Sequence, residues 1–145
     1  MLREMGVSSV FLEGREISRY RLLRMLASNT RSEVYLADDP LLNRPVAIKV
    51  TRTALATYPN AEVVKAAERL SQREAKAIAI LNHPHILPLF DFGEIPYEGA
   101  TLTYIVMPYC ADGSLADWLK VHADGKPLPP EDAVNLVCQV ASALQ

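Results

Sequence analysis

The residue in this sequence whose type and setting best suit chemistry is Lys49, in the short run Val-Ala-Ile-Lys-Val at residues 46–50. Side chains alternate between the two faces of a strand, so Lys49 would share a face with Ala47. A small side chain two positions from an ammonium leaves room for a flat ring such as adenine beside a group that binds phosphate. A strand lysine is also commonly a solvated surface residue, so the surrounding elements must decide between these interpretations.

The residues on either side predict two strands before this run and a long helix after it. Two short β-prone runs, residues 20–26 and 33–37, flank a polar link at residues 27–32, which is typical of an antiparallel pair. Residues 61–81 contain neither Pro nor Gly and are rich in Ala, Glu, Lys, Arg and Leu, which favours a helix of several turns. A small sheet and one helix would therefore position Lys49.

The second half of the chain predicts two further strands and two helices. Residues 86–92 and 102–107 read as strands, joined by a turn rich in Gly and Pro at residues 93–99. A short helix is expected at residues 114–119, and a second one runs from Pro130 in helical spacing up to the last residue. Its apolar stripe comprises Val134, Val137, Val140, Ala141 and Leu144.

The composition predicts a folded domain without a dominant charge. The 145 residues include 15 Lys and Arg against 17 Asp and Glu, for a net charge of -2, and 50% of them are hydrophobic. These values argue against disorder and give no sign of a nucleic-acid or membrane partner. No apolar run reaches the roughly 20 residues of a membrane helix, and we expect a cytoplasmic protein. Cys110 and Cys138 match no metal spacing and are expected to be free thiols.

This order of elements and motifs, from residue 20 to residue 145, resembles the N-terminal lobe of a protein kinase, in particular the bacterial Ser/Thr kinases of the eukaryotic-like type. The resemblance implies an α+β fold: a five-stranded antiparallel sheet with one long helix, followed by a hinge and two helices of the C-terminal lobe. Its implied divisions are a lead-in at residues 1–18, the N-terminal lobe at 19–107, the hinge at 108–113 and an incomplete C-terminal lobe at 114–145.

The resemblance also implies a catalytic pair. Lys49 matches the lysine of the family's third-strand motif, which binds the α and β phosphates of ATP. A glutamate of the long helix holds that lysine in place. Glu62, Glu68 and Glu74 all compete for this role, and Glu74 is favoured because it precedes the His-Pro-His-Ile link at residues 83–86 by about the family's interval. Neither histidine of that link needs a ligand role.

Further residues would surround the nucleotide by the same resemblance. Met107 would be the gatekeeper behind the adenine, whose edge would meet the carbonyl of Pro108 and the N–H of Cys110. Asp112 or Ser114 would reach the ribose, with Ser114 also placed as the N-cap of the first helix. The other residues implied to contact the nucleotide are Leu26, Ala27, Val34 and Ala47.

The loop that should hold the phosphates departs from the family pattern. Its three glycine positions fall on Ala27, Asn29 and Ser32, although glycine is what lets backbone N–H groups approach phosphate closely. The replacements are small, and Asn tolerates left-handed dihedral angles better than most residues. We therefore expect weakened or altered phosphate binding.

Two short motifs imitate later parts of a kinase domain. Asp-Phe-Gly at residues 91–93 spells the metal-binding motif, and residues 122–127 echo the catalytic loop, yet both stand too early in the chain. We expect the first to be ordinary strand and turn, and we assign no metal ligand to any residue present. The catalytic base and the Mg²⁺ ligands would lie beyond residue 145.

Three interpretations follow. In the first, the chain is the ATP-binding part of a Ser/Thr kinase that phosphorylates an unidentified protein substrate, inactive alone and covered along its last helix by the missing C-terminal lobe. In the second, favoured by the lost glycines, it is a degenerate pseudokinase-like lobe that binds a nucleotide weakly or serves as an interaction module. In the third, it is an unrelated structural α+β domain whose motifs are due to chance.

Overall fold

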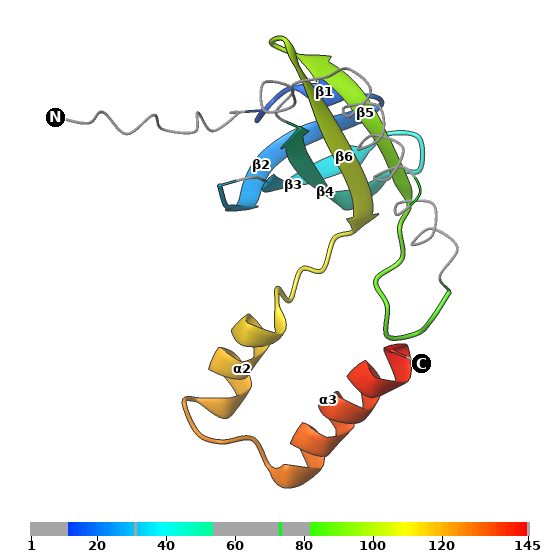
Figure 1. The fold of residues 1–145 in the computed structure, drawn as a ribbon. Coiled ribbons are helices and arrows are strands. Elements are labelled where there is room, and N and C mark those ends of the chain that lie inside the picture. The colour runs from blue at the N-terminus through cyan, green and yellow to red at the C-terminus, as the bar shows by residue number, and fades with distance from the viewer. Residues whose placement is uncertain (1–11, 31, 54–72, 74–81, 145) are drawn as a thin grey trace, which may run out of the picture.

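The structure, a computed structural model, describes residues 12–30, 32–53, 73 and 82–144 (Figure 1). The helix predicted at residues 61–81 lies outside the described residues, except for Arg73, which is helical and exposed. Glu74 lies outside them as well. The described part consists of one sheet followed by two helices.

The sheet has six strands in the order β1-β2-β3-β4-β6-β5, and every neighbouring pair is antiparallel. Five strands were predicted, and the sixth is a two-residue strand inside the segment interpreted as a lead-in. A strand this short has no periodicity to detect. The strands are β1 (Glu16–Ile17), β2 (Tyr20–Ser28), β3 (Ser32–Asp39), β4 (Arg44–Thr53), β5 (Asp91–Tyr97) and β6 (Ala100–Pro108).

One face of the sheet forms the core. Alternate residues of β3 and β6 are buried, as expected of strands with one face turned inward, and on β4 this face carries Val46, Ile48 and Val50. The sheet curls until its two edges meet, where the Tyr20 hydroxyl donates to Asp91 at 2.8 Å and the Arg15 guanidinium lies 5.5 Å from the centre of the Tyr97 ring (Figure 1). The buried core consists of Leu12, Ile17, Tyr20, Leu22, Tyr35, Ala37, Val46, Ile48, Val50, Leu102, Tyr104 and Val106.

The strand predicted at residues 86–92 corresponds to β5, which both begins and ends later in the chain. Most of residues 93–99 are therefore strand rather than turn. Gly93 and Pro96 had suggested a turn. A proline is tolerated in β5 because this strand lies at the sheet edge. A Cβ atom on Gly93 would lie 2.6 Å from the Tyr104 hydroxyl, so this glycine serves packing between β5 and β6 rather than a turn.

A fully buried carboxylate, Asp39, ties the turn between β3 and β4 to the residue before β2. Its Oδ1 lies 3.3 Å from Arg19 Nε, and it accepts from the main-chain N–H groups of Leu41 at 3.2 Å and Leu42 at 3.4 Å. Its Oδ2 lies 3.7 Å from Arg44 Nε. The buried negative charge is therefore compensated by two guanidinium groups and two amides.

The two helices after the sheet are α2 (Leu115–Ala123) and α3 (Pro130–Ala143). Helix α2 extends beyond the predicted residues 114–119, and α3 begins at Pro130 as predicted. Ser114 is the N-cap of α2, which confirms the prediction. It forms a reciprocal capping box, in which the Asp117 amide donates to the Ser114 hydroxyl while the Asp117 carboxylate accepts from the Ser114 amide at 3.0 Å.

This capping box predicts a pH dependence at the start of α2. Hydrogen bonds from the hydroxyl and the amide of Ser114 lower the pKa of Asp117 from its ordinary value of 3.8. Because the pKa is lower in the folded state, the cap stabilises α2 above about pH 4 and is lost as the pH falls through the lowered pKa. We expect a carboxyl NMR titration to show this lowered midpoint, and Ser114→Ala to return it toward 3.8. An unchanged midpoint in the variant would contradict the capping role.

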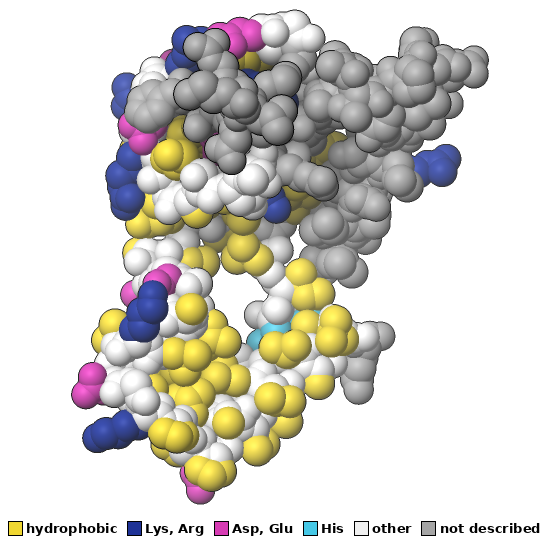
Figure 2. All heavy atoms as spheres, turned by 60° about the vertical axis from the view of Figure 1, so that its left-hand side comes forward, with side chains coloured by type: hydrophobic (Ala, Val, Ile, Leu, Met, Phe, Trp, Pro, Cys, Tyr) yellow, Lys and Arg dark blue, Asp and Glu magenta, His cyan; other side chains and the backbone are white. Residues whose placement is uncertain are grey.

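Apolar side chains gather on the helices. Figure 2 shows them spread over the lower part of the molecule, which the helices form. On α3 the side chains of Val134, Val137 and Val140 are 58%, 67% and 60% exposed. In the described part of the chain, no helix is long and apolar enough to cross a membrane. Cys110 and Cys138 are both exposed and free of disulfides.

Candidate functional site

Three strands bring predicted site residues into one row across the sheet. Ala27 of β2 pairs with Val34 of β3, and Val34 pairs with Lys49 of β4. Residues directly opposite one another in an antiparallel sheet point to the same face. Lys49 is exposed, whereas its chain neighbours Ile48 and Val50 are buried in the core. The row therefore lies on the face opposite the core.

A second row runs parallel to the first, two residues along β4. Leu36 of β3 pairs with Ala47, and Ala47 pairs with Met107 of β6. All three residues are apolar, and Ala47, whose side chain is a single methyl group, is 7% exposed. The two rows place an apolar surface with a small residue at its centre beside the ammonium of Lys49. This arrangement suits a ligand with a flat apolar ring and a negatively charged end.

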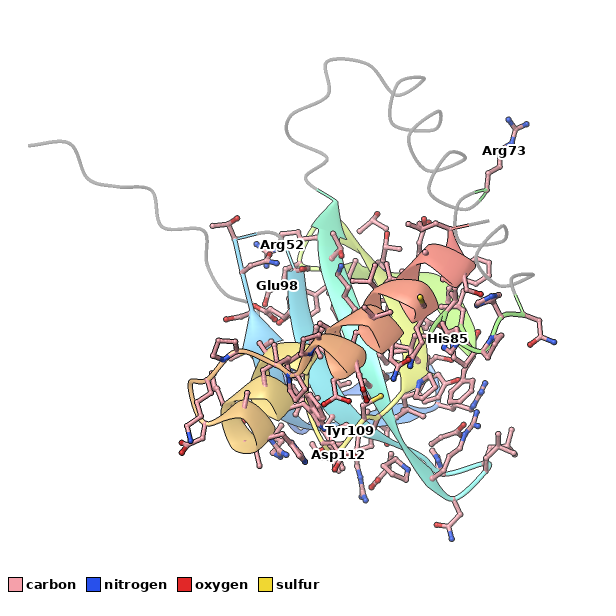
Figure 3. The ribbon with its side chains drawn as sticks, turned by 90° about the horizontal axis from the view of Figure 1, so that it is seen from below. Arg52, Arg73, His85, Glu98, Tyr109 and Asp112 are labelled. Carbon is pink, nitrogen blue, oxygen red and sulfur yellow. The ribbon has the colours of Figure 1, made fainter. Side chains whose placement is uncertain are left out.

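The chain leaves the sheet next to the second row. Strand β6 ends at Pro108, which pairs with Val46, and the next residues connect it to α2. Figure 3, which views the molecule from below, shows Tyr109 and Asp112 close together in this connection. The Gly113 amide donates to the Cys110 carbonyl at 3.1 Å, which closes a turn. The predicted hinge thus borders the apolar part of the candidate site.

Glycine is required at the end of this connection. Gly113 has a φ of +80°, a left-handed conformation that residues with side chains rarely adopt. A Cβ atom there would also lie 2.9 Å from Asp117 Oδ2. The hydroxyl of Ser114 donates to that same carboxylate oxygen at 2.6 Å. Of the two residues predicted to reach the ribose, Ser114 is therefore engaged in capping α2, whereas Asp112 is exposed.

The loop between β2 and β3 forms a turn closed by its own polar groups. The Ser32 amide donates to the side-chain oxygen Oδ1 of Asn29 at 2.8 Å, and the Asn29 amide donates to the Ser32 carbonyl at 2.9 Å. Asn29 and Ser32 stand at two of the three glycine positions of the kinase pattern. Their side chains and amides hold the turn itself, so the Ser32 amide already has an acceptor inside the loop.

The predicted catalytic pair is described only in part. Lys49 lies on β4 as predicted, and Glu74 lies outside the described residues. The pairing of these two residues stays a prediction. Arg73, the described residue next to Glu74, lies well away from the sheet in Figure 3.

Asp91, the acid of the Asp-Phe-Gly sequence, joins the two edges of the sheet. Asp91 is the residue at which the two sheet edges meet, because its Oδ2 accepts from Tyr20 and from Arg19 at 3.2 Å. Burial, followed by this hydrogen bond, raises the pKa of Tyr20, so its hydroxyl stays a donor at neutral pH. Among the described residues, no group of three His, Cys, Asp or Glu side chains is arranged to hold a metal ion.

Residues 122–127, which echo the catalytic loop, and the histidine link at residues 83–86 make hydrogen bonds and ring contacts with nearby residues of the chain. His122 lies in the last turn of α2, where its ring stacks on Trp118 and its Nδ1 lies 3.0 Å from the Trp118 carbonyl. Asp124 is the C-cap of α2 in a left-handed conformation. In the link before β5, His83 Nδ1 accepts from the His85 amide at 3.1 Å.

Sequence reasoning missed the segment before β2. Residues 12–17 were interpreted as part of a lead-in, yet Leu12 and Ile17 are each 1% exposed and belong to the core. The side chain of Glu13 accepts from the Met25 amide at 2.7 Å, next to the predicted site residue Leu26. The sequence signal for these core residues was weak, because it consisted of two apolar residues, Leu12 and Ile17, separated by a stretch that contains a glycine.

Comparison with known proteins defines the class. The family model of protein tyrosine and serine/threonine kinases matches residues 21–145. The chain therefore belongs to the protein kinase family, which confirms the predicted resemblance and the predicted α+β kinase fold.

The individual relatives are bacterial. The chain is 40% identical over 126 residues to the serine/threonine-protein kinase PknB of Mycobacterium leprae (strain TN), with 87% of this chain covered. It is 35% identical over 134 residues to the serine/threonine-protein kinase PrkC of Bacillus subtilis (strain 168), with 92% covered. The crystal structure of the Mycobacterium tuberculosis PknI kinase domain matches with a TM-score of 0.68 and 32% identity over 93% of this chain.

The match covers only part of each relative. The chain spans 19% of the length of PknB and of PrkC, and 50% of the PknI kinase domain structure. It therefore corresponds to a partial kinase domain of the bacterial Ser/Thr type.

Proposed function

We propose that this chain is the ATP-binding part of a Ser/Thr protein kinase, which transfers the γ-phosphate of ATP to protein hydroxyls when the whole domain is present. The observation that supports the proposal most is the register of the two rows, which sets Ala47 and Met107 beside Val34 and Lys49 on one face. A nucleotide laid across this face would put its ring on the apolar row and its phosphates by the ammonium.

The adenine would lie against Ala47, with Met107 behind it as gatekeeper. Its hydrogen-bonding edge would face the connection after β6, where we assign the Pro108 carbonyl as acceptor and the Cys110 N–H as donor. Proline at position 108 is compatible with this role, because it keeps its carbonyl oxygen. For the ribose we favour Asp112 over Ser114, whose hydroxyl is engaged with Asp117.

The phosphates would meet Lys49, and we retain Glu74 as the proposed partner that holds this lysine. Leu26 and Val34 would cover the ring together with Ala47, and Ala27 would stand at the start of the phosphate loop. The kinase family uses ATP together with Mg²⁺. We assign no Mg²⁺ ligand or catalytic base to the described residues.

Calorimetric titration of the full-length protein with ATP tests this proposal. We expect saturable one-to-one binding of ATP. Adenosine should compete with ATP, because the apolar row binds the ring in both compounds. A titration without saturable heat would overturn the proposed function. So would binding that adenosine leaves unchanged, since the ring would then contribute nothing.

The closed turn at the phosphate loop gives a prediction that glycine replacement tightens ATP binding. In Asn29→Gly/Ser32→Gly, the Ser32 amide would no longer donate to the Asn29 side chain, and the backbone could approach the phosphates. We expect the Kd for ATP to fall by about fivefold, the equivalent of one net hydrogen bond. The Kd for adenosine should not change, because adenosine carries no phosphate.

Thr30→Gly is the matched control for this variant, because it adds a glycine to the same loop at a position outside the kinase pattern. It should leave both Kd values within about twofold, well under the effect of one hydrogen bond. A double variant that binds ATP no more tightly than the parent protein would contradict the role that we give to the turn.

The same turn also supports the second candidate function, a non-catalytic lobe that binds a nucleotide weakly or serves as an interaction module. The two candidates differ in phosphoryl transfer. ATP binding together with phosphorylation of a generic protein substrate by the full-length protein would favour the kinase. Binding without transfer would favour the pseudokinase-like module.

For the exposed face of α3 we propose the rest of a kinase domain as the partner. Leu144, at the end of this helix, is 82% exposed, and the valines before it are more than half exposed. Apolar side chains in such a series are typical of a surface that another element covers. The matched PknI kinase domain is about twice as long as the aligned part.

A further inference from the structure

Strand β2 is irregular next to one predicted nucleotide contact. Met25 pairs with Tyr35 and Ala27 pairs with Val34, so Leu26 is an extra residue without a partner in β3. A bulge of this kind bends the strand and re-aims the side chain at the extra position. The direction of the Leu26 side chain therefore depends on how this bulge is held.

The outer edge of β2 is covered by the segment that precedes β1. The Gly14 amide donates to the Leu22 carbonyl at 2.9 Å, and the Leu22 amide donates to the Arg15 carbonyl at 2.9 Å. Further along the same strand, the Met25 amide donates to Glu13 Oε1 at 2.7 Å. The carboxylate of Glu13 thus takes the place of a strand partner at the residue immediately before Leu26.

The position of Glu13 is itself fixed by β3. The amide of Leu12 donates to the Tyr35 hydroxyl at 3.3 Å, and that hydroxyl donates to Glu33. Burial and the hydrogen bond to Glu33 raise the pKa of Tyr35, so the hydroxyl keeps its proton at neutral pH. Tyr35 is also the residue opposite Met25. Strand β3 therefore holds Leu12, the residue before Glu13, through the Tyr35 hydroxyl. Glu13 in turn holds Met25, the β2 residue opposite Tyr35.

We propose that Glu13 is a positioning residue for the nucleotide site, because its carboxylate fixes the β2 bulge and so aims Leu26 and Ala27 at the ring. This inference rests on the proposed function, since it concerns the same face of the sheet. Without Glu13, the part-buried amide of Met25 would lose its acceptor, and such a loss destabilises the local arrangement. The bulge would then be free to shift its register, moving the site residues with it.

The test uses paired variants of the full-length protein. Glu13→Ala removes the acceptor, whereas Glu13→Gln keeps a side-chain oxygen that can accept from Met25. We expect Glu13→Ala to raise the Kd for ATP by about fivefold, the equivalent of one hydrogen bond, and to speed hydrogen exchange of the Met25 amide. Glu13→Gln should restore both values to within about twofold, since it restores that bond. The control is Glu16→Ala, an exposed glutamate three residues away, which should change neither quantity.

The outcomes separate the two claims. Wild-type protein that binds ATP, with Glu13→Ala binding equally well, would overturn the positioning role. Unchanged exchange of the Met25 amide in Glu13→Ala would overturn the hydrogen bond on which it depends, as would a Glu13→Gln variant as weak as Glu13→Ala. Wild-type protein that binds no ATP would overturn the proposed function and, with it, a nucleotide role for Glu13.

Discussion

Replacing Lys49 with methionine is expected to raise the Kd for ATP by about tenfold or more and to abolish phosphoryl transfer by the full-length protein. Hydrogen bonds to charged groups contribute about 1.5–3 kcal/mol each, and about 1.4 kcal/mol corresponds to a factor of ten in Kd. We expect the lower end of this range because Lys49 is exposed on the outer face of the sheet. Calorimetric titration with ATP measures the change.

Two controls separate this effect from a general loss of charge or of folding. Lys126→Met removes an exposed lysine from the loop after α2 and should leave ATP binding unchanged. Adenosine should bind Lys49→Met as well as it binds the parent protein, because the ring contacts are intact. Equal ATP affinity of Lys49→Met and wild-type protein would contradict the phosphate-binding role of this lysine.

Replacing Asp39 with alanine is expected to lower the free energy of unfolding by about 3 kcal/mol, near the lower limit for breaking a buried ion pair. The carboxylate is 0% exposed, and its loss leaves Arg19 and Arg44 without their common anion. Two turn amides also lose their acceptor. The two arginine side chains remain partly exposed, at 39% and 35%, so water limits the cost. Urea denaturation followed by circular dichroism measures the difference.

The neighbouring residue provides the matched control. Asp38 pairs with Arg21 at 3.5 Å, but these side chains are 42% and 63% exposed. Exposed ion pairs contribute about 0–1 kcal/mol, so Asp38→Ala should change the free energy of unfolding by less than about 1 kcal/mol. Equal losses in the two variants would contradict the view that burial makes Asp39 important.

Much of the sheet could be predicted because its signals are local. The alternation of residues 46–50 identified β4 and its core face, and the β-prone runs on either side of residues 27–32 identified β2 and β3. The N-cap of α2 was equally local, since serine three residues before an acid is itself the capping signal. Each of these features depends on neighbours within a few positions of the chain.

The features that escaped prediction depend on residues far apart in the sequence. Arg19 contacts Asp39, 20 residues away, and Asp91, 72 residues away, and only the curled sheet brings them together. The end of β5 was misplaced because Gly93 resembles turn punctuation, and the actual reason for this glycine, the close approach of Tyr104, lies on another strand. Local sequence carries no record of such contacts.

The candidate site was predictable by motif and refined by structure. Lys49 and Met107 were named from family patterns, and the register adds that both belong to neighbouring rows on one face. In the structure, the Ser114 hydroxyl donates to Asp117 in the cap of α2. We therefore propose Asp112 rather than Ser114 as the ribose contact. Glu13 lies outside the kinase motifs of this sequence, and its side chain is linked to the site through the bulge of β2.

Mapping the residue labelled by a lysine-reactive ATP analogue tests whether this face of the sheet binds a nucleotide. We predict that an acyl-phosphate derivative of ATP labels Lys49 in the full-length protein, that excess ATP prevents the labelling, and that exposed Lys126 is not protected. Labelling of Lys49 that ATP fails to prevent, or that matches Lys126 in its response to ATP, would contradict a nucleotide site at this position.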